Sequence, residues 1–120
     1  MRVALLLPVL WLCGMGCSKN TAAPTPLPAD QLPAAMQKAF SKAKPEIKAL
    51  ADEAVAAVQA ADYSKAFNGF QGLGGLPELT QEQRDVTTRA SMTVSGLLQA
   101  AQAQGDQKAA ETLKNYRINK

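Results

Sequence analysis

Apolar residues recur at helical spacing along nearly the whole chain after Asp30, and this pattern restricts the possible folds more than any other feature. Leu32, Met36 and Phe40, for example, fall four residues apart and so share one face of a helix. No stretch alternates apolar and polar residues over the length of a β-strand, and valine and isoleucine are sparse. The sequence therefore predicts an all-α domain of four to five antiparallel helices.

Prolines, glycines and capping side chains divide this pattern into its helices. Pro45 lacks an N–H and disfavours helical geometry at Lys44, so one helix ends before it and another begins there. Thr80 and Gln83 have the spacing of a capping box, which opens the longest helix. The other boundary signals are two N-capping aspartates and a set of glycines with one proline at helix ends: Asp62, Asp106, Gly72, Gly74, Gly75, Gly105 and Pro77.

The predicted core is the set of apolar side chains that share a face of each helix. Its members are Leu32, Met36, Ala39, Phe40, Ala43, Ile47, Leu50, Ala51, Ala54, Val55, Val58, Tyr63, Ala66, Phe67, Phe70, Leu73, Val86, Ala90, Val94, Leu97, Leu98, Ala101, Ala109, Ala110, Leu113 and Tyr116. Three aromatic residues of the third helix have a second interpretation, as apolar contacts for a partner if that helix is exposed: Tyr63, Phe67 and Phe70.

The amino end has a different pattern. Arg2 precedes an apolar run from Val3 to Leu12, and the sequence Cys13-Gly14-Met15-Gly16-Cys17 follows it. A run this short does not cross a bilayer, which needs about 20 apolar residues. The segment resembles the signal peptide and lipobox of a bacterial lipoprotein. This resemblance implies cleavage between Gly16 and Cys17 and attachment of acyl chains such as palmitate to Cys17. An ordinary secretory signal cut at the same bond and an uncleaved anchor are the alternatives.

Residues 17–30 form a lipidated N-terminus and a tether in this interpretation, between a signal peptide at 1–16 and a helical domain at 31–120. Pro24, Pro26 and Pro28 alternate with small residues, a composition that favours extended polyproline II. From Ser18 to Ala29 such a tether spans on the order of 35 Å. In the lipoprotein family, an aspartate after the acylated cysteine marks retention in the inner membrane. Ser18 stands there, which implies an outer-membrane protein facing the periplasm.

Two turns in the helical part look alike. Ala61-Asp62-Tyr63 leads into a helix with Ala66 and Phe70, and Gly105-Asp106 repeats the turn 44 residues later. This arrangement resembles the second half of a tetratricopeptide repeat, which implies helical hairpins that bind a protein or peptide. A small helical bundle, in which the apolar stripes are simply core, is the alternative. Two hairpins are fewer than the three repeats that a solenoid usually needs, so the first helix is expected to cover an end, or the domain to pair with another copy.

The composition argues against catalysis. The chain has no histidine, and Cys13 would leave with the signal peptide, so the commonest general base and the thiol nucleophile are both missing. Glu78, Glu82 and Asp85 surround a helix start, where negative charge is favourable, and they lack the spacing of a calcium loop. We therefore predict no catalytic residue, no cofactor and no metal site.

The charge distribution and the lipoprotein resemblance indicate which partners to expect. The formal charge of +3 is spread without a block of like charges, which excludes a nucleic-acid partner. The expected partners are the membrane, through the acyl chains, and an envelope protein that the sequence does not identify. Lys120 behind Tyr116-Arg117 resembles the carboxyl end of the major murein lipoprotein, whose terminal lysine is bonded to peptidoglycan. This resemblance implies an alternative function as a structural link between the membrane and peptidoglycan.

Overall fold

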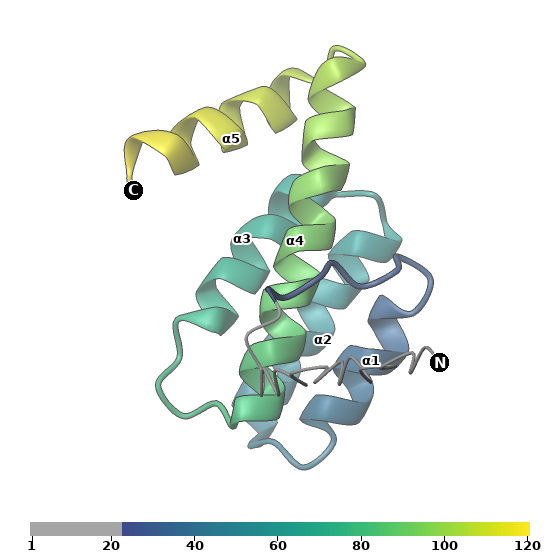
Figure 1. Ribbon diagram of the computed structural model, residues 1–120, viewed down its shortest axis with the longest axis vertical. Coiled ribbons are helices and arrows are strands. Elements are labelled where there is room, and N and C mark those ends of the chain that lie inside the picture. The colour runs from purple at the N-terminus through teal and green to yellow at the C-terminus, as the bar shows by residue number, and fades with distance from the viewer. Residues whose placement is uncertain (1–22) are drawn as a thin grey trace, which may run out of the picture.

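The computed structural model describes residues 23–120, and this part of the chain is helical without a strand (Figure 1). The helices are α1 (Leu32–Phe40), α2 (Pro45–Gln59), α3 (Tyr63–Gly74), α4 (Gln81–Ala103) and α5 (Gln107–Ile118). The predicted all-α fold of four to five helices is confirmed. The expected signal peptide, its cleavage site and Cys17 lie outside the described residues.

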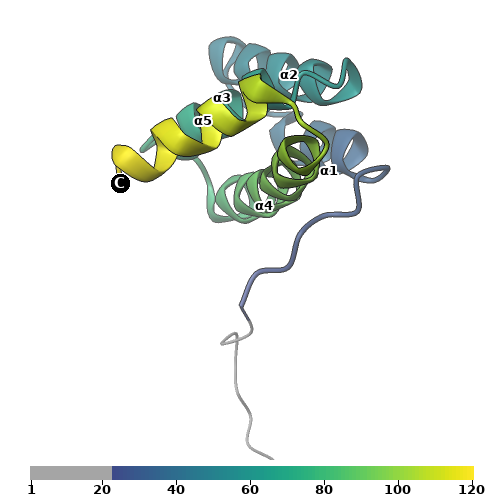
Figure 2. The same ribbon diagram turned by 90° about the horizontal axis from the view of Figure 1, so that it is seen from above.

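Helices α1 to α4 form a small bundle, and α5 extends it. Each of these four helices packs against the next along the chain, and α1 also packs against α4, which closes the bundle. The carboxyl-terminal part of α4 projects beyond its neighbours, and α5 turns back from it toward α3 (Figures 1 and 2). The first helix therefore covers α2 and α4, as expected if the domain closes on itself.

The core is built from the apolar faces predicted for each helix. Its largest fully buried side chains are Phe40, Phe70, Leu32, Met36, Leu73, Leu98, Val94 and Thr87. Leu50 was predicted to be core but is 45% exposed, and Ala57 is buried instead. The cause is the close approach of α2 and α3: a Cβ placed on Gly69 would lie only 3.1 Å from the Cβ of Ala54. The buried face of α2 therefore carries alanines, and the larger Leu50 lies outside it.

Most helix ends lie where the sequence predicts them. The capping box is present, with the Gln83 N–H donating to Thr80 Oγ1 (3.2 Å) and the Thr80 N–H donating to Gln83 Oε1 (3.0 Å). Helix α1 ends at Phe40, so Ala43, predicted on its apolar face, lies in the turn before Lys44, which has the extended conformation expected before a proline. Of the glycines predicted to end α3, Gly74 is its last residue and Gly75 its C-cap, whereas Gly72 lies inside the helix.

The two turns that resemble each other in sequence have the same backbone geometry. Among residues 23–120, positive φ occurs at Ala61 (58°) and Gly105 (94°), and each of these residues follows the C-cap of a helix. The N–H of Asp62 donates to Ala57 O (2.9 Å), and the N–H of Asp106 donates to Ala101 O (3.0 Å). Both turns are thus Schellman motifs, and in both the aspartate then caps the next helix.

The last part of the predicted tether is docked on α4 and is not free. Leu27 is buried, and its carbonyl accepts a hydrogen bond from the Thr93 hydroxyl at 2.6 Å. Arg89 Nε donates to Thr25 O at 2.9 Å. We call Thr25–Leu27 the strap. It shortens the part of the tether that can act as a spacer.

Candidate functional site

The residues singled out from the sequence occupy three kinds of position. Cys17 lies outside the described residues. Phe67 and Phe70 are buried and Tyr63 is half-buried, so the interpretation of the α3 aromatic residues as core holds for both phenylalanines. Lys120 is exposed at the end of the chain.

Residues 23–120 contain neither a metal-binding cluster nor a helix able to span a membrane. No group of histidine, cysteine, aspartate or glutamate side chains there is arranged to hold a metal ion. Within the same residues, no helix combines the length and the apolar character needed to span a bilayer.

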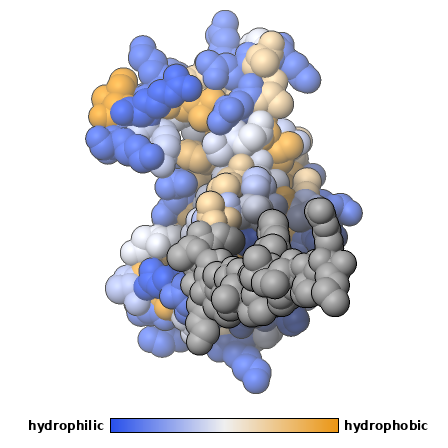
Figure 3. Space-filling view, in the orientation of Figure 1, coloured by the Kyte–Doolittle hydropathy of each residue, from blue (hydrophilic) through white to orange (hydrophobic). Residues whose placement is uncertain are grey.

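A notch lies on the surface between α3 and α5 and is lined by hydrogen-bonding side chains. Its volume is about 260 Å³, and Figure 3 shows the outline of the molecule indented below α5. The lining side chains include four carboxamides, one hydroxyl and one phenol: Asn68, Gln71, Asn115, Asn119, Thr112 and Tyr116. We call this hollow the α3–α5 notch.

The floor of the notch is aromatic. Phe67 is buried, and its ring meets that of Tyr116 edge-to-face with 5.1 Å between ring centroids. Lys120 Nζ lies 5.1 Å from the centroid of the Tyr116 ring. Such edge-to-face pairs add a stabilising contact beyond the area that they bury, so the floor holds α3 and α5 together.

A seam of polar contacts next to the notch fixes the position of α5. Lys108 Nζ donates to Asp62 Oδ1 at 3.2 Å, and the Thr112 hydroxyl donates to Ser64 Oγ at 2.9 Å. Asp62 also accepts a hydrogen bond from the N–H of Lys65. This bond and the Lys108 ammonium hold the pKa of the Asp62 carboxyl below its ordinary value. The seam joins the two similar turns, which are far apart in sequence.

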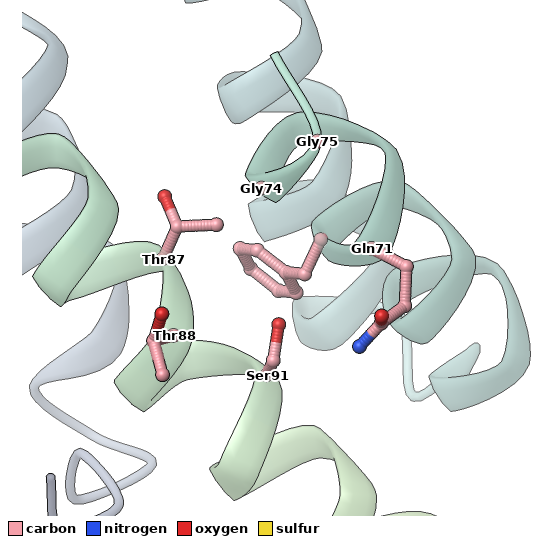
Figure 4. A pocket seen from close by; sticks show the side chains of 7 residues that line it. Gln71, Gly74, Gly75, Thr87, Thr88 and Ser91 are labelled. Carbon is pink, nitrogen blue, oxygen red and sulfur yellow. The ribbon is translucent and has the colours of Figure 1, made fainter. Parts of the chain in front are cut away.

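A larger hollow of about 390 Å³ lies between the end of α3 and α4 (Figure 4). Gly74 and Gly75 form one wall, and Thr87, Thr88 and Ser91 line the other. In Figure 4 the Ser91 hydroxyl points into the space between the two helices. The Thr87 hydroxyl is buried without a hydrogen-bond partner in the described part of the chain. The lining side chains are uncharged, so this hollow offers hydrogen-bonding groups and the Phe70 ring but no charge.

The notch residues were missed in the sequence because they flank the apolar stripes. Asn68 follows the buried Phe67, and Asn115 precedes the half-buried Tyr116. The signal that could have found them is the 3–4 spacing of Thr112, Asn115 and Asn119, which places three polar side chains on one edge of a helix. Comparison with protein families, with curated proteins and with solved structures gave no significant match to the chain.

Proposed function

We propose that this protein is a small lipid-anchored, non-catalytic helical module of the bacterial cell envelope that binds another envelope protein. The anchor is Cys17, and the location is the outer membrane, facing the periplasm. The resemblance of residues 1–17 to a lipoprotein signal supports the anchor, and the two similar turns support tetratricopeptide-like hairpins. The lack of histidine supports a role without acid–base catalysis.

The strap is the structural feature that supports this proposal most directly, because it connects the anchor to a defined face of the domain. Figure 2 shows the chain leaving the bundle on the side of α1 and α4, away from α2 and α3. From Cys17 to Thr25 the chain advances eight residues, which span at most about 28 Å when fully extended. An anchor at Cys17 therefore holds the domain close to the bilayer and leaves α2, α3 and α5 accessible to a partner.

Site-specific photocrosslinking in intact cells tests this orientation. A benzophenone amino acid at Asp52 on α2 or Lys114 on α5, both exposed, is expected to give a defined adduct with an envelope protein. The matched control is Met92, which lies one turn from Arg89 on the side of α4 that the strap crosses, and no adduct is expected there. The Cys17→Ser variant should lose the adduct together with the anchor. Adducts from Met92 alone, or none from any position, would refute the proposal.

Attachment to peptidoglycan is the second candidate, and the position of Lys120 favours it. Its ammonium is exposed beyond the end of α5, where a wall peptide could reach it. Muramidase digestion of the same cells separates the two functions. A wall-linked chain gains the mass of muropeptides and loses it in Lys120→Arg, whereas a protein-binding module keeps its mass in both.

A further inference from the structure

We propose that the α3–α5 notch is a binding site for an uncharged N-acetylated saccharide. This activity goes beyond the proposed protein interaction and does not depend on it. Four properties of the notch support this ligand: its lack of charge, its hydrogen-bonding groups, its aromatic floor and the contacts that hold its walls together.

The lining of the notch carries no charge and so favours an uncharged ligand. All seven lining side chains are neutral: Phe67, Asn68, Gln71, Thr112, Asn115, Tyr116 and Asn119. An ionised ligand would find no counter-charge among these seven side chains, so they give it no advantage over an uncharged molecule. The nearby Lys120 ammonium lies over the Tyr116 ring and is exposed, so solvent screens its charge.

The hydrogen-bonding groups of the notch are available to a ligand. The side chains of Asn68, Gln71, Asn115 and Asn119 form no hydrogen bond with any other part of residues 23–120. Each carboxamide offers two N–H donors and one carbonyl acceptor. An acetamido group has the complementary N–H and C=O, and each sugar hydroxyl can both donate and accept. The pairing therefore favours an N-acetylated sugar.

The balance of polar and aromatic groups favours a saccharide over a peptide segment. Peptides gain most of their affinity from apolar side chains that fill pockets, whereas this notch has six polar groups around two rings. A sugar ring has an apolar C–H face and many hydroxyls, so it can replace the exposed Lys120 side chain over the Tyr116 ring while its edge reaches the carboxamides. Small-molecule sites commonly combine a few aromatic side chains with oriented polar groups in this way.

The walls of the notch are rigid enough to serve as a site. Contacts from Lys108 to Asp62 and from Thr112 to Ser64 hold α5 on α3 beside the notch. Asn68 and Gln71 lie on α3 and Asn115 lies on α5, whereas Asn119 follows the last residue of α5, so three of the four carboxamides are attached to helical backbone. The notch is thus formed before a ligand arrives.

Titration of the full chain in detergent micelles with tri-N-acetylchitotriose tests the proposal, with side-chain carboxamide signals observed by ¹⁵N NMR. Saturable shifts of the notch carboxamides are expected at millimolar saccharide. Asn115→Ala and Gln71→Ala should each weaken binding about fivefold, the equivalent of one lost hydrogen bond. Gln102→Ala on α4 removes an exposed carboxamide outside the notch and should leave binding unchanged. Alanine is a good helix former, so the thermal unfolding midpoints of the variants should match that of the parent.

Two further probes establish the ligand class. Cellotriose lacks the acetamido groups and is expected to bind at least tenfold more weakly than the acetylated trimer. A neutral tripeptide, acetylated and amidated, should cause no saturable shift of the notch carboxamides. The proposal is overturned if the trimer causes no saturable shift, if Gln102→Ala weakens binding as much as the notch variants, or if cellotriose or the tripeptide binds as tightly as the trimer.

Discussion

At the scale of single residues, the two left-handed turn positions provide a matched test of the fold. Ala61 has φ of 58°, a conformation that costs an L-residue about 1 kcal/mol, whereas Gly105 adopts φ of 94° without a Cβ. Ala61→Gly is therefore expected to raise the free energy of unfolding by about 0.5–1 kcal/mol. Gly105→Ala should lower it by a similar amount, although nothing lies within 4 Å of the added methyl. Urea unfolding followed by circular dichroism measures both, and a destabilised Ala61→Gly would contradict the turn geometry.

The same substitution at two buried threonines of α4 is expected to change the free energy of unfolding in opposite directions. Thr87 has a buried hydroxyl without a partner among residues 23–120, so Thr87→Val should raise the free energy of unfolding by about 1 kcal/mol. The Thr93 hydroxyl donates to Leu27 O, so Thr93→Val should lower it by about 1–2 kcal/mol because the strap carbonyl loses its donor. Thermal unfolding of the two variants side by side checks the difference in sign. Equal effects would show that the strap is not held as described.

At the scale of the helices, the position of α5 depends on a titrating contact. Hydrogen bonds from the Lys65 N–H and the Lys108 ammonium lower the pKa of Asp62, so its folded-state pKa lies below the unfolded one. The stabilisation is therefore complete above the ordinary aspartate pKa of about 4 and is lost as the pH falls through the folded value. Asp62→Asn should be less stable than the parent at pH 7 and equal to it near pH 2.

Unfolding in urea at a series of pH values measures this difference. Lys108→Met serves as the control, because it removes the smaller contribution and keeps the N-cap bond to Lys65. That variant should lose only part of the pH dependence that Asp62→Asn loses. A gap between the parent and Asp62→Asn that persisted unchanged to pH 2 would contradict the role of the carboxylate.

The helices themselves were predictable because their signals are local. Thr80 with Gln83, and Asp62 and Asp106, mark helix starts through contacts with residues three positions away. Leu50 was assigned to the wrong side because periodicity alone does not reveal how closely α2 approaches α3 at Gly69. Local sequence patterns thus predict the helices but do not predict how closely the helices pack.

At the scale of the whole molecule, the features that local pattern missed depend on contacts between distant residues. Gln83 is a capping residue, yet its Nε2 also donates to Ala39 O on α1, 44 positions away. Thr93 binds the strap across 66 positions. The α3–α5 notch is likewise assembled from two helices whose packing no local motif encodes. The fold class was therefore predictable from sequence, whereas the strap and the candidate site were not.

In the function proposed above, acyl chains on Cys17 hold the helical domain beside a bilayer, and the strap sets its orientation. The most direct measurement is growth of a Gram-negative bacterium producing the chain with labelled palmitate, followed by intact-mass analysis of the isolated protein. We expect the parent chain to begin at Cys17 and to carry lipid mass and label. The Cys17→Ser variant should have neither and should leave the membrane fraction. A parent chain without lipid mass, or a Cys17→Ser variant that stays labelled, would contradict the proposed anchoring.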